Sequence, residues 1–396
     1  MPNTTATTIG RRVSLLSTGG DNPRNGEGTF LRLADNAILY AYSRYRGDDW
    51  GDHALADIAG IISHDEGETW SEPVILLRAD AAASNYMCPS LARMPGGDIG
   101  LAYLRKYRDD SILCDSVWGA VLDTVCFVRS SDEGKTWSAP IECTHGTVYD
   151  VIENDRLLVL STGRIVLPVN RHSTVENSTV ENSTVDNSTV ENGTLKIGGA
   201  GRMFLLASDD DGRTWFTLSD EYRITNAPYS DTGLQETVVF EEEGGRLRAF
   251  SRTDQLCQYE CFSTDGGKTW TENHPIPFFS SAVSPMIVRR VSGIPGVPGT
   301  PGNPQIVAVW NPTPLYTTRD QGKIWGRTPL ALAISDNDGK TFSRTYLLED
   351  DPGNGYCYPS VFDGGEYLLV GYYHSNDTGI VLNANVIKKV MKSELI

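Results

Sequence analysis

The sequence contains no uninterrupted apolar run long enough to cross a bilayer, which requires about 20 residues. It also lacks a basic region: Lys and Arg together number 34, Asp and Glu number 51, and the formal net charge is −17. A nucleic-acid-binding protein normally presents a basic face, so neither a membrane nor a nucleic acid is predicted as a partner. An acidic protein can bind an anionic ligand only where several Arg side chains gather locally.

Metal-binding and disulfide patterns are absent as well. The seven cysteines are odd in number and scattered without a C-x-x-C pair, which indicates reduced thiols. The six histidines form no cluster with ligand spacing, and no glycine-rich phosphate loop precedes a helix, so no metal and no cofactor is predicted. Because the N-terminal residues lack an apolar signal segment, we expect a cytoplasmic protein, although a mature secreted form would look the same.

Turn-forming residues and strand-like runs dominate what is present. The chain has 39 Gly, 20 Pro and 17 Tyr, and helical periodicity is missing, which favours an all-β fold with many short strands. The clearest strand-like runs are 37–42, 99–104, 157–160, 165–169, 238–240, 248–251, 306–310 and 368–373.

An internal repeat predicts the architecture. The pattern S-x-D-x-G-x-T-W occurs four times, and a fifth copy has Asn and Phe in place of Asp and Trp. In such a turn the Ser and Asp side chains bond backbone amides, Gly adopts a positive φ, and Trp packs on the sheet. The copies begin at Ser63, Ser130, Ser208, Ser263 and Ser335.

One such turn in each four-stranded unit is typical of a propeller blade. The spacing of the copies, 55 to 78 residues, divides the chain into about six blades. We therefore predict a single six-bladed β-propeller domain over residues 1–396, closed by a strand near 12–17 that pairs with one near 380–387. Two low-complexity segments interrupt it: the pentad repeat within 173–194, expected as an exposed hairpin or loop, and the Gly/Pro-rich loop 293–304.

Charged and aromatic residues recur near the ends of these strands. Glu236 and Arg252 flank a tight Gly-Gly turn, so a hairpin would bring them to the same end. Arg327 and Tyr358 stand in later segments. The first segment supplies Arg24 and Glu27, and 25 residues after Arg24 comes Asp49, in the run Asp-Trp-Gly-Asp-His that ends at Asp52 and His53.

The repeats and this ordered set resemble bacterial sialidases of glycoside hydrolase family 33. The resemblance implies that Tyr358 is the nucleophile, Glu236 its partner, and Asp49 or Asp52 the general acid/base; sequence does not separate the two. It also implies that the substrate's carboxylate is bound by Arg24, Arg252 and Arg327. The family's Phe/Tyr-Arg-Ile-Pro motif is absent, and Pro-Arg-Asn stands around Arg24 instead.

The chemistry suits these residue types, because a neutral phenol avoids the repulsion that a carboxylate nucleophile would meet beside the anionic substrate. We therefore expect an exo-acting, retaining glycoside hydrolase for a terminal carboxylated sugar. A hydrolase or lyase for a uronate-type sugar and a non-catalytic glycan-binding propeller stay open as alternatives. Further substrate-binding candidates, each with a structural alternative, are Glu27, His53, Arg156, His172 and Tyr356.

Overall fold

The computed structural model describes residues 8–108, 114–115, 121–144, 148–177, 193–294, 305–313, 327–375 and 383–395. Within these ranges the chain forms strands β1 to β26 and one short 3-10 helix, Lys392–Glu394. The predicted all-β fold is confirmed. None of the helices in these ranges has the length and apolar character needed to span a membrane.

The described strands form five hydrogen-bonded sheets. The largest has eight strands: β2 (Asn25–Arg32), β3 (Ile38–Tyr45), β4 (Ala56–Ser63), β5 (Val74–Leu77), β6 (Ala83–Arg93), β7 (Ile99–Arg108), β9 (Val121–Ser130) and β10 (Ile141–Glu142). The next has six: β8 (Cys114–Asp115), β11 (Asp150–Val151), β12 (Leu158–Val159), β13 (Ile165–Asn177), β14 (Gly193–Ser208) and β15 (Phe216–Thr217).

The other three sheets have four strands each. The first contains β16 (Gln235–Glu241), β17 (Leu247–Arg252), β18 (Cys257–Ser263) and β19 (His274–Ser280). The second contains β20 (Ile287–Val291), β21 (Gln305–Trp310), β22 (Leu330–Ser335) and β23 (Ser343–Glu349). The last contains β24 (Tyr356–Asp363), β25 (Tyr367–His374), β26 (Ala384–Met391) and β1 (Arg11–Leu16).

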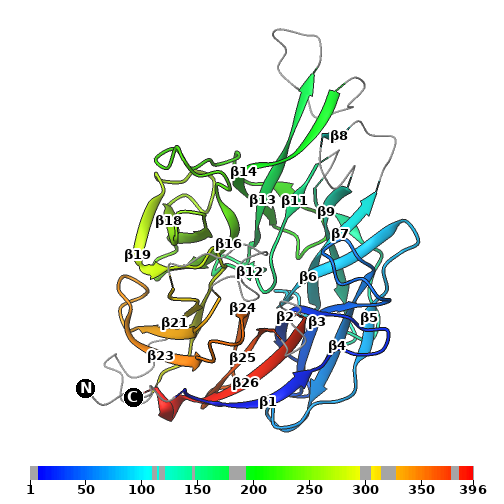
Figure 1. The fold of residues 1–396 in the computed structure, drawn as a ribbon, viewed down its shortest axis with the longest axis vertical. Helices are drawn as coiled ribbons and strands as arrows, with labels where there is room; N and C mark the ends of the chain where they lie inside the picture. The colour runs from blue at the N-terminus through cyan, green and yellow to red at the C-terminus, as the bar shows by residue number, and fades with distance from the viewer. Residues whose placement is uncertain are drawn as a thin grey trace.

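The sheets are arranged around a common centre, where β2, β6, β12, β16 and β24 lie (Figure 1). The first strand of each four-stranded unit contacts the first strands of neighbouring units, as this arrangement requires. Strand β2 contacts β6 and β24, and β20 contacts β16 and β24. The sheets number five in this part of the chain, not six, because one parallel pair, Ala56 with Asn85, joins two antiparallel four-stranded units into the eight-stranded sheet.

Closure follows the predicted route. Strand β1 pairs antiparallel with β26, with Ser14 opposite Ile387 and Leu16 opposite Asn385, so the two ends of the chain share one sheet (Figure 1). Covering the edge of β26 with the N-terminal strand ties the last sheet to the first segment of the chain.

The repeated turns bond as their sequence predicts. In the first copy the Ser63 hydroxyl accepts from the Gly67 amide at 2.8 Å, and Asp65 accepts from the Thr69 amide at 2.8 Å. Gly67 has a φ of 81°. In the degenerate copy Asn337 takes over the same bond, accepting from the Thr341 amide at 2.9 Å. These turns are structural and lie at one end of the sheets.

The low-complexity segments are described only at their edges. Residues 173–177 pair with 193–197 and lengthen the hairpin of β13 and β14, as expected of a hairpin extension. Residues 178–192 and 295–304, which hold most of the pentad repeat and of the Gly/Pro loop, lie outside the described ranges.

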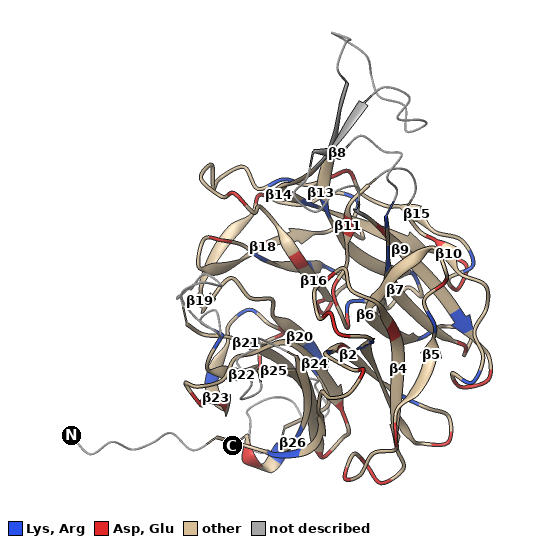
Figure 2. Cartoon of the chain, turned by 45° about the vertical axis from the view of Figure 1, so that its right-hand side comes forward, with Lys and Arg blue, Asp and Glu red and all other residues tan. Residues whose placement is uncertain are grey.

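In the described part of the chain, acidic and basic positions are both distributed over strands and loops (Figure 2). Many of these charges pair locally, as when Arg93 bonds both oxygens of Glu133 at 2.7 and 2.8 Å. The net charge of −17 is therefore a property of the whole surface.

The repeated turns also pack against neighbouring sheets. Substitutions at two of their glycines can test this contact. A Cβ added at Gly212 (φ 79°) would lie 2.5 Å from the buried ring of Phe127, whereas at Gly134 (φ 81°) the nearest atom is 3.6 Å away. Both Ala substitutions strain the backbone, but only Gly212→Ala overpacks the core. We expect Gly212→Ala to lose about 1–3 kcal/mol more unfolding free energy than Gly134→Ala in urea denaturation. Equal losses would contradict this packing role.

Candidate functional site

Backbone bulges in the first strands aim side chains toward the centre. Register shifts interrupt β6 between Met87 and Ser90, β16 between Gln235 and Val238, and β24 between Cys357 and Ser360. Inside these bulges Cys88, Glu236 and Tyr358 have φ values of 55°, 48° and 53°. Non-glycine residues resist this conformation, and proteins retain it mostly at functional sites.

Three predicted residues meet at the bulges of β16 and β24. The Tyr358 hydroxyl donates to Glu236 Oε1 at 2.9 Å, and Arg252 Nη1 lies 2.6 and 2.7 Å from the two Glu236 oxygens. Arg252 Nη1 also donates to the Tyr358 hydroxyl at 3.4 Å. The predicted hairpin accounts for this meeting, because Gln235 pairs with Arg252 across β16 and β17.

The electrostatics of this cluster keep the phenol protonated. Burial raises the pKa of Tyr358 well above its usual value, and the Glu236 carboxylate raises it further. Burial alone would lower the pKa of Arg252, but the Glu236 carboxylate outweighs it and raises that pKa. The result is a neutral phenol that donates to a carboxylate, the arrangement in which a base can take its proton.

Arg327 lies beneath the phenol. Its guanidinium carbon is 5.3 Å from the centroid of the Tyr358 ring, Nη1 donates to the Cys357 sulfur at 3.3 Å, and Nη2 donates to the Val283 carbonyl at 3.2 Å. Only 2% of Arg327 is exposed. The structure therefore brings Arg327 to the predicted cluster, with its guanidinium covered.

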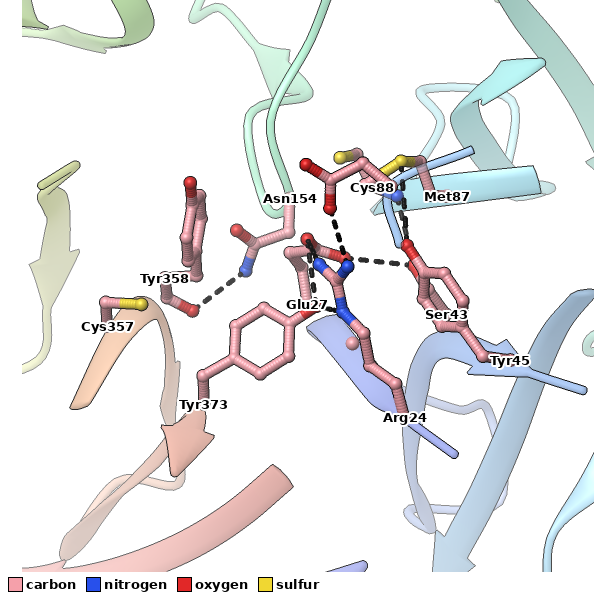
Figure 3. A network of polar contacts seen from close by, with 12 residues as sticks. Arg24, Glu27, Ser43, Tyr45, Met87, Cys88, Asn154, Cys357, Tyr358 and Tyr373 are labelled. Carbon is pink, nitrogen blue, oxygen red and sulfur yellow. Dashed lines mark hydrogen bonds and ion pairs between the residues drawn. The ribbon is translucent and has the colours of Figure 1, made fainter. Parts of the chain in front are cut away.

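Arg24 is the centre of a second cluster, which Figure 3 shows beside Tyr358. Its Nε donates to the Tyr373 hydroxyl at 2.8 Å, its Nη1 to Asp52 at 2.6 Å, and its Nη2 lies 3.4 Å from Glu27. The Tyr373 hydroxyl donates in turn to Glu27 at 3.1 Å. The rings of Tyr373 and Tyr358 make an edge-to-face contact at 5.6 Å, which links the two clusters.

The loop between β3 and β4 carries both candidate acids. Asp49 is exposed and accepts from the Gly51 amide at 2.9 Å, as in a turn. Asp52 reaches Arg24. His53 stands next to it, and burial, aided by Lys106, lowers the pKa of His53 to about 4. Of the two acids, Asp52 contacts the cluster of Arg24, whereas the bond described for Asp49 is within its own turn.

His172 on β13 lies near the Glu236 and Arg252 pair, whose charges act on it, and burial lowers its pKa. Its imidazole packs on the backbone of β14, since a Cβ added at Gly201 would lie 2.5 Å from the ring. The structure thus brings His172 to the edge of the site.

Two of the predicted substrate-binding residues are structural. Arg156 is 1% exposed, and its guanidinium donates to the carbonyls of Asn154 and Met286 at 3.0 Å and of Glu236 at 3.5 Å. Burial lowers the pKa of Arg156 to about 10. It supports the strained backbone of Glu236 from below and does not face a ligand.

Tyr356 is the second correction. It is fully buried in the core formed with β20 to β25, where its ring packs on Tyr372 and His374. The bulge that follows Cys357 separates its orientation from that of Tyr358. Tyr356 is therefore core, and the rival candidate Tyr358 faces the site.

Sequence reasoning missed several residues near the centre. Tyr373 orients Arg24, and the Tyr45 ring lies 4.5 Å below the same guanidinium. Glu153, 4% exposed, comes from the loop after β11. Burial, and then the nearby carboxylates of Glu236 and Glu27, raise the pKa of Glu153. No motif marks these positions; a polar residue next to a strand end was the only available signal.

One group of the described residues could hold a metal ion: ligand atoms of Glu27, Cys88 and Glu153 lie within 4.8 Å of one another. No spacing in the sequence predicts this group, because its three residues come from β2, β6 and the loop after β11. Burial raises the pKa of both carboxyls and of the Cys88 thiol, which opposes the deprotonation that metal binding requires.

A separate open hollow lies at the other end of the sheets, around the turns at Thr162–Gly163 and Gly244–Gly245 and the salt bridge of Arg164 with Asp209. None of the clustered residues lines it. The predicted chemistry therefore belongs to the bulged ends of the first strands, and not to this hollow.

The radial sheets, the repeated turns and the Arg, Glu and Tyr clusters define a β-propeller of the sialidase-like class. The chain belongs to the BNR repeat-like domain family, whose model matches residues 51–374. The resemblance inferred from sequence is thereby confirmed.

Individual relatives agree with this class. A sialidase of Paraclostridium sordellii is 26% identical over 259 residues, covering 62% of this chain and 56% of the relative. A sialidase of Bacteroides fragilis is 25% identical over 271 residues, covering 67% and 42%. The chain thus spans about half the length of the curated relatives that it matches.

Solved structures share the fold. A leech intramolecular trans-sialidase superposes with a TM-score of 0.68 at 16% identity, covering 98% of this chain and 71% of the other. The NanB sialidase of Streptococcus pneumoniae superposes with a TM-score of 0.69 at 13% identity, covering 98% and 71%. At these identities the likeness concerns the fold.

The structural role of Arg156 can be separated from a ligand-binding role. Arg156→Met leaves buried carbonyls without donors, so we expect a loss of about 1–3 kcal/mol in unfolding free energy. Arg11→Met, which removes an exposed ion pair with Glu68, should change it by less than about 0.5 kcal/mol. Urea denaturation measures both. An Arg156→Met variant as stable as the wild type would restore the predicted substrate-binding role.

Proposed function

We propose that this protein is an exo-acting glycoside hydrolase that removes a terminal carboxylated sugar from glycans with retention of configuration. Sialic acid is the sugar that we propose as its substrate. The observation that carries the proposal is the 2.9 Å bond from the Tyr358 hydroxyl to Glu236, with Arg252 beside both. The sialidases among its relatives support the substrate class.

The first half-reaction uses this dyad. Glu236 takes the phenolic proton of Tyr358, and the phenolate oxygen attacks the anomeric carbon. The glycosidic bond breaks as Asp52 gives its proton to the leaving oxygen. The product is a glycosyl-tyrosine, and the arginines hold the substrate's carboxylate beside the reacting carbon.

The second half-reaction reverses these roles. Asp52, now a carboxylate, takes a proton from water, and the hydroxide oxygen attacks the anomeric carbon from the side that the leaving group left. The bond to Tyr358 breaks and Glu236 returns the proton to the phenolate oxygen. Two displacements give net retention. Asp52 is preferred to Asp49 because Asp52 contacts the cluster of Arg24.

We further infer that the propeller has six blades. The eight-stranded sheet consists of two antiparallel four-stranded units, β2 to β5 and β6 with β7, β9 and β10, linked by one residue pair. Counting these units as two blades and each other sheet as one supports that number.

The nucleophile is tested with a matched tyrosine pair. Tyr358→Phe removes the attacking oxygen, so hydrolysis of a fluorogenic sialoside should fall by about a thousandfold or more. Tyr356→Phe should keep wild-type activity, because its hydroxyl has no hydrogen-bond partner among the described residues. Release of a uronic acid from a glycan panel, with no sialoside cleaved, would move the protein to the uronate class. A Tyr358→Phe variant with full activity would refute the mechanism.

Retention and the covalent step are tested separately. A 3-fluorinated sialosyl fluoride should leave a sugar adduct on the peptide that contains Tyr358, found by mass spectrometry after digestion. Proton NMR of early product should show the anomer of the substrate, because two inversions cancel. An inverted first product would contradict the double displacement.

A further inference from the structure

The N–H groups of the Arg24 guanidinium contact four partners. Nε bonds the Tyr373 hydroxyl at 2.8 Å, Nη1 bonds the Trp50 carbonyl at 3.2 Å and Asp52 at 2.6 Å, and Nη2 faces Glu27 at 3.4 Å. Two of the four are carboxylates. A substrate carboxylate that binds Arg24 must therefore share its charge with these anions or replace one of them.

Of the two carboxylates, only Asp52 is free to leave. Glu27 is 2% exposed and is held also by Ser43 at 3.2 Å and by Tyr373 at 3.1 Å. Tyr373 is fully buried in the last sheet. The side chain of Asp52, by contrast, is 61% exposed and sits on a loop, although it makes the shortest of the bonds to Arg24.

Three anions around one guanidinium repel one another, since like charges this close disfavour the charged form. Relief comes from removing Asp52 from Arg24 and from neutralising Asp52 with a proton. Both changes favour the incoming carboxylate, and the second supplies what a general acid needs.

We propose that the substrate's carboxylate displaces Asp52 from Arg24 and that the released Asp52 takes up a proton, so that binding itself prepares the general acid. The inference rests on the proposed function and adds to it a coupling between carboxylate binding and protonation. Asp52 is in this account both the competitor of the substrate and its proton donor.

The charges around Asp52 fit the direction of this coupling. The protein atoms around Asp52 oppose its ionisation, although its side chain reaches solvent, but Arg24 outweighs them and lowers the pKa of Asp52 to about 2. Without that contact, the like charges of Glu27 and Asp123 favour the protonated form of Asp52. The other titratable groups that interact electrostatically with Asp52 are Glu27, Tyr45, His53, Lys106, Asp123 and Tyr149.

The sign of the pH dependence follows by linkage. If the pKa of Asp52 is low in the free protein and higher in the complex, the complex binds one more proton between those two values. Carboxylate affinity should then weaken as pH rises, by up to tenfold per unit, and become independent of pH above the raised pKa. Lys106 stays paired with Asp123 at 2.5 Å and keeps its charge throughout.

The experiment measures proton uptake by calorimetry in two buffers of different ionisation enthalpy, between about pH 4.5 and about pH 7.5, the range above the usual Asp pKa. The probes are 2,3-dehydro-N-acetylneuraminic acid, its methyl ester and glucuronic acid. We expect the wild type to take up as much as one proton with an acid probe, and none with the ester. Asp52→Asn should bind the acid more tightly and take up none. Asp48→Asn, an exposed neighbour, should match the wild type.

Three other outcomes would change this proposal or the proposed function. No uptake in the wild type, or equal uptake in Asp52→Asn, overturns the coupling and assigns any proton to another group. A wild type that binds neither acid overturns it as well. Binding of glucuronic acid with uptake, but not of the sialic-acid analogue, leaves the coupling standing and removes the sialoside assignment.

Discussion

The pairing of the largely covered Glu236 carboxylate with Arg252 and Tyr358 is the interaction on which the site depends. A charge removed from water must be paired and hydrogen-bonded, and here Arg252 and the phenol of Tyr358 supply that compensation. The phenol in turn is held neutral by the charge it touches. Arg252, Glu236 and Tyr358 are thus one hydrogen-bonded unit, and removing Glu236 or Arg252 would change the pKa of the phenol.

The backbone that holds this cluster is strained. Glu236 and Tyr358 both have positive φ values inside bulges, a conformation that non-glycine residues keep only when their surroundings impose it. Arg156 contributes to that support by bonding the Glu236 carbonyl and the loop at Asn154, and Asn154 donates to the Tyr358 carbonyl at 3.4 Å. Buried residues outside the cluster therefore help to determine where Glu236 and Tyr358 point.

How far sequence could predict this site depends on which contacts are local. The repeated turns and the strand runs follow from short patterns, and the meeting of Glu236 with Arg252 follows from one hairpin. That Tyr356 is buried in the core could not be predicted, because a bulge changes which side chains of β24 face the centre. Tyr373 and Glu153 reach the site only through closure of the ring, which no local pattern encodes.

Under the proposed function, the arginines explain how a protein of net charge −17 could select an anionic sugar. Two of them are paired with carboxylates, Arg252 with Glu236 and Arg24 with Glu27 and Asp52, while Arg327 lies against the Tyr358 ring. Long-range attraction therefore contributes little, and a carboxylate gains only by exchanging with a partner already present. Such an exchange favours binding of a ligand whose carboxylate takes the position of the partner that it replaces, and it does not favour binding of other anions. Selectivity arises in this way from the same pairing that keeps buried charges stable.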